Sequence, residues 1–173
     1  MPDYVILTDS SADLSAEMVR EAGVTVLPLS FTIQGGTYQN TPDNREMDPA
    51  LFYDMLRAGE LATTSAVNVA AYTDTVEPLL QAGKDVLILA FSSGLSTTCN
   101  SAEVAAEELR EQYPQRKLYV VDTLCASMGQ GLLVDLAVQE KRKGKDIEAV
   151  RDFVQETIPH LCHWFTVGDL SQL

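Results

Sequence analysis

The sequence predicts an α/β fold with a mainly parallel sheet and helices on both of its faces. Short apolar runs of strand length alternate along the chain with longer stretches whose apolar residues recur at helical spacing. This alternation is typical of βαβ units, in which a helix connects two parallel strands and covers one face of the sheet. No internal repeat is visible in the 173 residues, which suit one domain, alone or with a fragment of a second.

The expected strands are short and apolar. They cover residues 4–8, 24–29, 85–91, 117–121 and 164–167. The run at 85–91, DVLILAF, is the clearest buried strand. Pro28 places the second strand at an edge of the sheet or ends its pairing, because proline has no N–H to donate. We expect residues 31–33 to extend that strand as far as the turn at Gly35-Gly36, and residues 34–47 to form a polar, turn-rich excursion.

The expected helices follow from apolar spacing and from end signals. They cover residues 14–22, 49–57, 68–81, 95–112, 124–143 and a last stretch from 146 to just before Pro159. Gly23 stops the first helix, and Asp48 and Asp146 are positioned as N-caps. Pro49 occupies the first position of its helix, where proline is favoured. Pro78 is expected to interrupt or end the helix that contains it.

Composition excludes several classes of protein. With 25 acidic and 12 basic residues, the net charge of −13 disfavours nonspecific binding to nucleic acid or to anionic membranes. No apolar run approaches the roughly 18 residues that cross a bilayer, so an integral membrane protein is not expected. The first residues lack the basic region of a signal peptide, which favours a cytoplasmic location. Three cysteines are too few and too scattered for a disulfide framework or a zinc site.

Hydroxyl groups gather in the connections that lead from strands to helices. The segments are 8–11, 63–65, 92–98, and Asp122-Thr123 with Ser127, and none of them contains Lys or Arg. In an open parallel sheet, the loops that follow strands meet at the carboxyl edge, where ligands bind and helix N-termini offer free N–H groups. We therefore expect a crevice of neutral donors, able to hold a small anionic or carbonyl group. The alternative is that these side chains only cap helices.

The stretch 92–101 argues against capping alone. It has six hydroxyl side chains among ten residues, which is more than one cap needs. Gly94 within it suggests a turn with positive φ or a close backbone approach. Phe52 and Tyr53 are expected in the core, although an apolar helix beside the crevice would also line an acyl channel.

Other motifs are weaker. Gly129-Gln130-Gly131 lies in a helical stretch and favours close helix packing over dinucleotide binding. Asp9, with Asp122 as its one companion, favours capping or loop hydrogen bonds over a metal site or a general base, since hard cations need six or more oxygens. A serine acyl hydrolase, an esterase or thioesterase using Ser92 or Ser93 at a sharp strand-to-helix turn, remains an alternative. It lacks the G-x-S-x-G pattern, and the two histidines, His160 and His163, come late in the chain.

A set of short motifs occurs in order along the whole chain. The motifs are TDSSADL at 8–14, Pro28-Leu29, TTS at 63–65, SSGLST at 92–97 with NSA at 100–102, VDT at 121–123 with Ala126-Ser127 and Gly129, and FTV at 165–167 with Asp169-Leu170. Taken together, these segments resemble the DegV family of bacterial fatty-acid-binding proteins, which includes the FakB-type proteins that present fatty acids to a kinase. The order and spacing of the motifs make the resemblance specific.

The chain departs from the family pattern in two ways. The family continues Thr-Thr-Ser with Gln-Pro-Ser, whereas this chain has Ala66-Val67-Asn68, of which Asn68 still suits a helix cap. The resemblance also implies a second domain, with a basic segment and a histidine near the head group. Residues 1–173 resemble the amino-terminal domain alone, which appears truncated before or within the second domain, so we do not transfer those roles to His160 or His163.

The resemblance implies a non-enzymatic carrier for a long-chain fatty acid such as palmitate. By position, Thr64 and Ser93 match the hydroxyls that hold the carboxylate, with Thr63, Ser65 and Ser96 as neighbours. No cofactor or metal is expected, and the implied partners are the fatty acid and a fatty acid kinase. An isolated domain with half of a lipid pocket would expose an apolar patch, which favours self-association. A module without any ligand is the third possibility.

Overall fold

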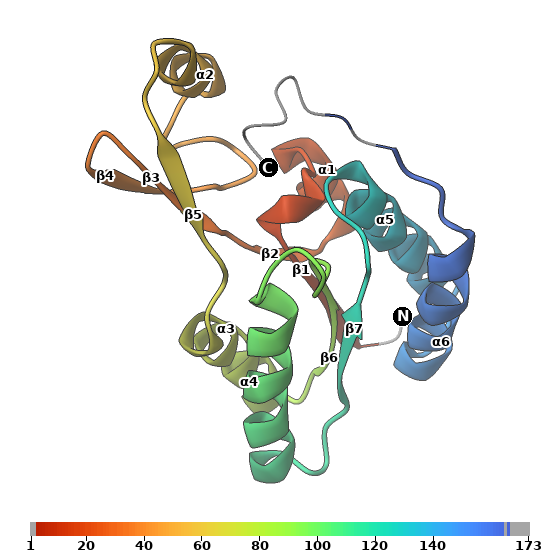
Figure 1. Ribbon diagram of the computed structural model, residues 1–173. Coiled ribbons are helices and arrows are strands. Elements are labelled where there is room, and N and C mark those ends of the chain that lie inside the picture. The colour runs from red at the N-terminus through yellow and green to blue at the C-terminus, as the bar shows by residue number, and fades with distance from the viewer. Residues whose placement is uncertain (1–2, 165, 167–173) are drawn as a thin grey trace.

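A four-stranded parallel sheet lies between two layers of helices in the computed structural model, which describes residues 3–164 and 166 (Figure 1). The strand order is β2-β1-β6-β7, and all neighbouring strands are parallel. The strands are β1 (Tyr4–Asp9), β2 (Thr25–Leu27), β6 (Asp85–Ala90) and β7 (Leu118–Asp122). The short β2 is an edge strand, as Pro28 predicts, and the predicted α/β fold class is confirmed.

Apolar side chains fill both faces of this sheet. In β6, Leu87 and Leu89 pack toward one helix layer while Val86 and Ile88 pack toward the other, because successive side chains of a strand point to opposite faces. The first layer contains α1 (Ala16–Ala22), α5 (Met128–Arg142) and α6 (Ile147–Thr157), and the second contains α3 (Val69–Gln81) and α4 (Thr98–Gln112). Burial of these side chains is the main stabilising contribution to the fold.

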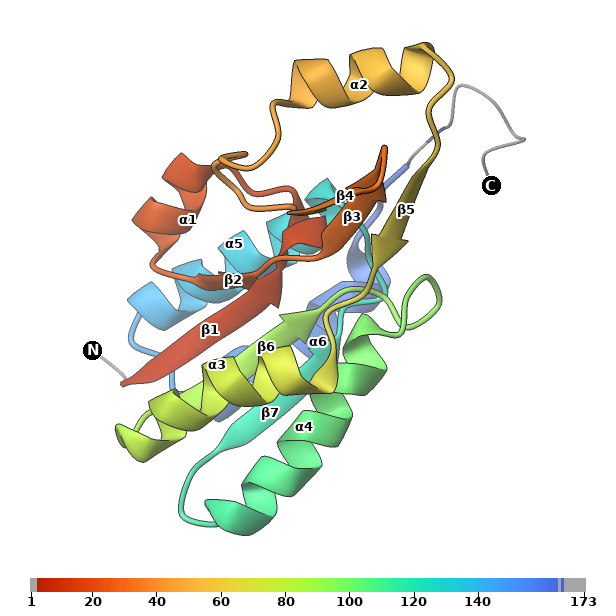
Figure 2. The same cartoon turned by 90° about the vertical axis from the view of Figure 1, so that its left-hand side faces the viewer.

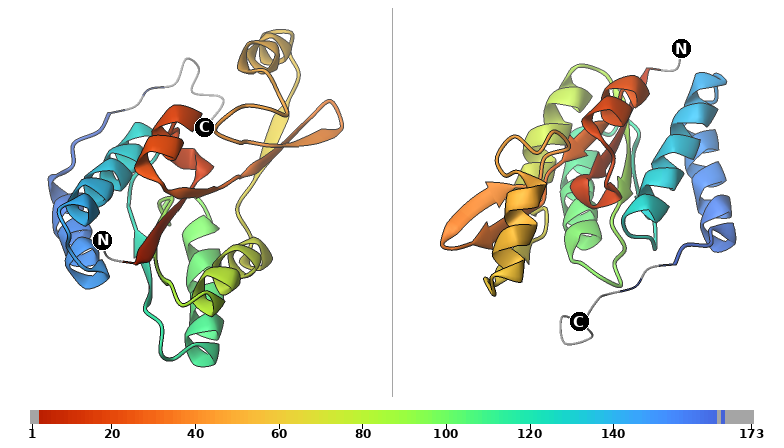
Figure 3. Two further views of the ribbon diagram at one scale, coloured as in Figure 1. Left: turned by 180° about the vertical axis from the view of Figure 1, so that it is seen from behind. Right: turned by 90° about the horizontal axis from the view of Figure 1, so that it is seen from above.

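A second, antiparallel sheet is inserted between β2 and α3. It contains β3 (Ser30–Ile33), β4 (Gly36–Gln39) and β5 (Ala62–Ser65) in the order β4-β3-β5, with α2 (Pro49–Arg57) between β4 and β5. We call residues 30–65 the arm. It extends past the carboxyl ends of the parallel strands (Figure 2). Seen from above, it lies on the opposite side of the molecule from α5 and α6 (Figure 3).

The structure of the arm differs from three expectations. Residues 31–33 do not extend β2 but form β3, and the excursion predicted over 34–47 contains β4. Thr63–Ser65, expected as a loop, belongs to strand β5. The Gln34-Gly35 turn explains the β3–β4 hairpin, since both residues have positive φ (49° and 77°), as a two-residue type I′ turn requires.

Most helix ends lie where local signals place them. The side chains of Asp48, Asn68 and Asp146 each accept a hydrogen bond from a backbone N–H of the first turn that follows. Helix α3 runs through Pro78 to Gln81, because a proline one turn from the end removes a single hydrogen bond and Leu80 beyond it is buried.

Three helix starts are later than expected. Helix α1 begins at Ala16, because Ser15 Oγ caps it by accepting from the Met18 N–H. Helices α4 and α5 begin at Thr98 and Met128 instead of residues 95 and 124. For α5 the reason is the backbone: Leu124 and Ser127 have φ of 53° and 50°, which a right-handed helix excludes.

Two further points concern the chain end and helix length. Of the strand expected over 164–167, residues 165 and 167 lie outside the described residues, and Trp164 is not in a strand. Within the described part of the chain, no helix is long and apolar enough to cross a bilayer.

Candidate functional site

The buried carboxylate of Asp9 organises the carboxyl edge of the sheet. Its Oδ2 accepts hydrogen bonds from the backbone N–H of Phe91 (2.8 Å) and from Gln130 Nε2 (3.2 Å), and its Oδ1 accepts from the N–H of Ser11 (3.1 Å) and from the Ser11 hydroxyl. Burial raises the pKa of the Asp9 carboxyl, although these hydrogen bonds act in the opposite direction. Asp9 thus forms hydrogen bonds to neighbouring loops, which is the role that the sequence favoured over metal binding. Among the described residues, no cluster of three or more His, Cys, Asp or Glu could hold a metal.

The loop after β6 carries the candidate Ser93 on a fixed backbone. The Ser92 N–H donates to Cys125 O (3.2 Å), and the Ser93 N–H donates to Asp122 Oδ1 (3.1 Å). The Ser93 side chain is exposed, and its hydroxyl has no hydrogen-bond partner among the residues described. Ser96, by contrast, is engaged: its Oγ lies 2.9 Å from Thr98 Oγ1 and accepts from the Thr98 N–H. Of the two candidates in this loop, Ser93 therefore has the hydroxyl that is available to a ligand; the exposed Thr97 hydroxyl also has no partner among the residues described.

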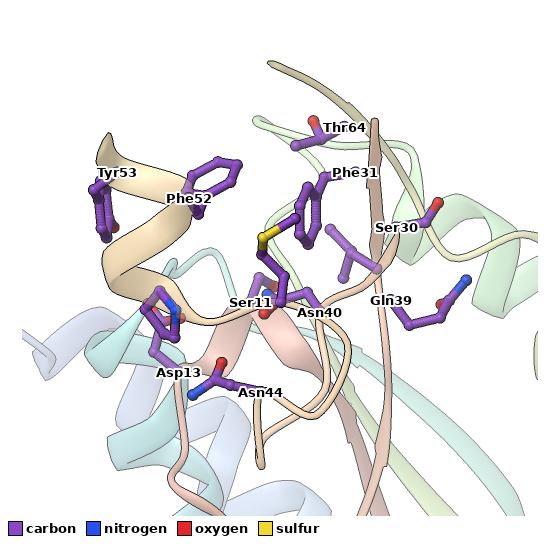
Figure 4. A pocket seen from close by; sticks show the side chains of 13 residues that line it. Ser11, Asp13, Ser30, Phe31, Gln39, Asn40, Asn44, Phe52, Tyr53 and Thr64 are labelled. Atoms are coloured by element: carbon purple, nitrogen blue, oxygen red, sulfur yellow. The ribbon is translucent and has the colours of Figure 1, made fainter. Parts of the chain in front are cut away.

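The arm and the parallel-sheet part of the chain, which contributes Ser11, Asp13 and Leu29, form a cavity of about 350 Å³ between them (Figure 4). Aromatic side chains form one end of it: the Phe31 ring on β3 meets Phe52 of α2 edge-to-face at 5.1 Å, and Phe52 meets Tyr53 at 5.5 Å. Asp13 and Asn44 lie at the other end. The described residues that line the cavity include no Lys or Arg. The cavity therefore offers an apolar wall at one end, uncharged hydrogen-bonding groups, and the acidic side chain of Asp13 at the other end (Figure 4).

Strand register decides which hydroxyl of β5 faces this cavity. Thr64 pairs directly with Phe31, so their side chains share one face of the arm sheet, and Thr64 lines the cavity. Thr63 and Ser65 alternate to the opposite face, and neither is among the lining residues. The Thr64 hydroxyl has no hydrogen-bond partner within the described part of the chain.

The structure places the two main candidates on different elements. Thr64 stands on β5 in the cavity wall, whereas Ser93 is in the loop after β6 and does not line the cavity. Sequence reasoning did not find Phe31, Asn40 or Asn44 as lining residues. The polar, turn-rich composition of 34–47 was the one signal that pointed to this segment.

Apolar side chains are also exposed around the carboxyl edge. Four leucine and methionine side chains, between 47% and 59% exposed, make up what we call the apolar rim: Leu95, Leu124, Met128 and Leu132. They come from the loops after β6 and β7 and from the first turns of α5. A group of this kind on the surface typically marks a site of interaction.

The hydrolase alternative gains no support from the geometry. The Ser92 side chain is buried, and its Oγ accepts from the Gly94 N–H (3.2 Å). The ring of His163 lies against Gly129, where a Cβ would approach it to 3.0 Å. Among the described residues, neither histidine forms a hydrogen bond with Ser92 or Ser93, so the nucleophile–base pair of a triad is not assembled.

Comparison with known proteins identifies the family. The model of the DegV family, described as a family of uncharacterised proteins, matches residues 3–173. The chain belongs to the DegV family. A DegV domain-containing protein of Clostridium perfringens is 42% identical over 173 residues, which are all of this chain and 59% of the relative. A second, of Lactococcus lactis, is 34% identical over 98% of this chain and 58% of the relative.

Solved DegV structures share the fold. A DegV family protein of Thermus thermophilus, described as fatty acid binding, superimposes with a TM-score of 0.79 at 32% identity, covering 91% of this chain and 54% of that one. A stearic acid-binding protein of Eubacterium ventriosum superimposes with a TM-score of 0.78 at 26% identity, covering 88% of this chain and 52% of the other. This DegV-family chain thus spans little more than half the length of the proteins that it matches.

Proposed function

We propose that this DegV-family chain is a non-enzymatic carrier that binds a long-chain fatty acid. The carboxylate is held by the hydroxyls of Thr64 and Ser93, and the acyl chain lies along the apolar wall formed by Phe31 and Phe52. Ser96 supports the Ser93 loop through its own hydrogen bonds. Thr63 and Ser65 belong to the same strand as Thr64 but point to the other face, so their part in the site is indirect.

One observation carries this proposal. The Thr64 hydroxyl, which has no partner among the described residues, stands beside Phe31 at the aromatic end of the cavity, whereas the acidic Asp13 lies at the other end (Figure 4). An acidic head group needs hydrogen-bond donors when it leaves water, and a hydrocarbon tail needs an apolar wall. The relatives described as fatty acid-binding and stearic acid-binding support the same ligand class.

The energetics agree with such a ligand. Burying roughly 15 methylene groups at ~0.8 kcal/mol each contributes at most about 12 kcal/mol. Ordering the tail and losing rigid-body freedom remove several of those kcal/mol. Hydroxyl donors then need only to offset the desolvation of the carboxylate, so a salt bridge is not required for binding.

We also propose that the carrier presents its ligand to a fatty acid kinase. Neutral hydroxyls hold a carboxylate less firmly than an arginine fork, which leaves the head group accessible for phosphoryl transfer by a partner. The apolar rim beside Ser93 offers a contact surface for a partner protein or for a second copy of the chain. Sedimentation velocity over a range of concentrations tests self-association.

Native mass spectrometry tests the carrier function. Protein purified from cells should retain an added mass in the range of a fatty acid, and added palmitate or oleate should raise the melting temperature. Lipid-free protein whose melting temperature does not respond to either fatty acid contradicts the proposal. A chromogenic acyl ester serves as the control: turnover that disappears in Ser93→Ala would favour the hydrolase.

A further inference from the structure

Two carboxylates hold the backbone that follows β6, one from the strand on each side. Asp9, at the end of β1, accepts the N–H of Phe91 at 2.8 Å. Asp122, at the end of β7, accepts the N–H of Ser93 at 3.1 Å. Both neighbouring strands, β1 and β7, therefore hold the backbone that follows β6. Asp122 acts on this backbone at Ser93.

Asp122 also holds the loop that follows its own strand. The same Oδ1 atom accepts the N–H of Leu124 at 3.1 Å. Leu124 has φ of 53°, a conformation that disfavours residues with a Cβ, and its side chain is 59% exposed in the apolar rim. A strained conformation persists only where the surroundings impose it. The two N–H donors thus converge on one oxygen atom, which couples the Ser93 loop to the apolar rim.

We propose that Asp122 is a positioning residue for ligand binding: its Oδ1 fixes the Ser93 backbone so that the Ser93 hydroxyl meets the fatty-acid carboxylate. This inference rests on the proposed function. Asp122 does not touch the ligand and acts through Ser93.

The role requires an acceptor oxygen but not a negative charge. A carboxylate close to a bound carboxylate weakens binding by repulsion, so its charge is no advantage there. Asp122 Oδ2 accepts no hydrogen bond from any described residue, so an amide NH2 group at that position would displace no donor. Asparagine can therefore keep both hydrogen bonds at Oδ1, and Asp122→Asn separates the geometric role from the charge.

The test compares five purified variants with the unaltered chain in titrations with palmitate. Asp122→Ala removes the acceptor and should raise the dissociation constant about tenfold, the loss expected for one misplaced hydrogen bond. Asp122→Asn should bind as tightly as the unaltered chain or more tightly. The exposed Asp74 side chain on α3 has no hydrogen bond to any residue that the structure describes, so Asp74→Ala removes the same charge alone and should leave binding unchanged. In a background of Ser93→Ala, the further change Asp122→Ala should cost less than twofold.

The double substitution distinguishes positioning from a general structural effect. If Asp122 acts through Ser93, the two losses are not additive, whereas independent sites give additive losses. Additive losses, or a dissociation constant that Asp122→Ala leaves unchanged, overturn the proposal. Failure of Asp122→Asn to restore binding overturns the claim that the acceptor oxygen is what matters.

Amide hydrogen exchange separates this inference from the proposed function. Asp122→Ala should speed the exchange of the Ser93 and Leu124 N–H groups while the amides of β6 stay protected. If Asp122→Ala speeds this exchange but the unaltered chain does not bind palmitate, the carrier function and the use of Ser93 are refuted. Only the contact between Asp122 and the Ser93 backbone then remains. Unchanged exchange refutes the positioning role even where palmitate binds.

Discussion

Gln130 on α5 donates a hydrogen bond to Asp9 at the end of β1, with Nε2 and Oδ2 3.2 Å apart and both side chains fully buried. The same Nε2 lies 3.0 Å from Thr8 Oγ1, and Oε1 accepts from the Ser11 hydroxyl at 3.1 Å. A polar contact in the interior thus sets the position of the helix along the sheet. Buried polar groups of this kind are costly when a partner is lost.

Gln130→Ala should lower the free energy of unfolding by about 2–4 kcal/mol, because it removes one of the donors to the buried Asp9 carboxylate and the donor to buried Thr8 Oγ1, and opens a small cavity. Urea denaturation measures the change. Gln139→Ala is the matched control on the same helix, since the Gln139 side chain is exposed and contacts only Asp135 (2.7 Å) among the described residues. It should stay within about 0.5 kcal/mol of the unaltered chain. Equal effects from the two substitutions would contradict the assigned role.

Asp9 should give stability a specific pH dependence. Burial raises its pKa in the folded state above the ordinary value of 3.8, so the folded chain binds a proton more readily than the unfolded chain. Its contribution is therefore complete below about pH 3.8 and is lost as the pH rises through the folded-state pKa. Asp9→Asn cannot titrate, so the stability advantage of the unaltered chain over this variant should shrink from pH 3.5 toward neutrality. Urea midpoints measured as a function of pH test this, and an advantage that grows with pH would be the opposite result.

A side chain at position 131 should destabilise the fold, whereas a side chain at position 129 should be tolerated. A Cβ at Gly131 would lie 2.7 Å from the backbone oxygen of Ala12, which cannot yield without moving α5 away from the β1–α1 connection. A Cβ at Gly129 would meet the side chain of His163 at 3.0 Å, and an exposed side chain can rotate away. We expect Gly131→Ala to destabilise by about 1–3 kcal/mol and Gly129→Ala to be nearly neutral. Thermal denaturation of both variants would show whether the difference exists.

If Thr64 holds the carboxylate as proposed, Thr64→Val should weaken fatty-acid binding about tenfold, since it removes the proposed donor and keeps the side-chain volume. Thr63→Val makes the same chemical change one residue earlier, on the opposite face of β5, and should bind as the unaltered chain does. Titration calorimetry with oleate gives both dissociation constants, and melting temperatures establish that both variants are folded. If Thr63→Val has the larger effect, the assigned face of the strand is wrong.

Local signals in the sequence are sufficient to predict the parallel sheet and the helices that cover it. Strand β6 is a continuous apolar run, and Asp48 and Asp146 mark helix starts through their own side chains. Strands β4 and β5 of the arm were missed because they are four residues long and rich in Thr, Ser and Gly, so they show no apolar alternation. Their stability depends on partners distant in the chain, such as Ser30 and Ser65, which no local pattern reveals.

The candidate site was predictable in part. The hydroxyl-rich connections pointed to the carboxyl edge, and the family resemblance pointed to Thr64 and Ser93. That Thr64 and not Thr63 faces the cavity depends on the register of β5 against β3, which is a tertiary property. The role proposed for Asp122 depends on the hydrogen bond between two residues that are 29 positions apart, and sequence spacing alone does not indicate that contact.

The pairing of Ser30 with Ser65 brings together the two ends of the 36-residue arm. Directly opposed residues of an antiparallel pair lie about 5 Å apart, so the chain leaves the body and returns to it at nearly the same point. The connection from β2 to α3 can therefore be completed independently of the residues that lie between Ser30 and Ser65. Evolution or an engineer could exchange the arm for another hairpin, or shorten it to a tight turn, and so change the ligand specificity proposed for this chain without redesigning its core.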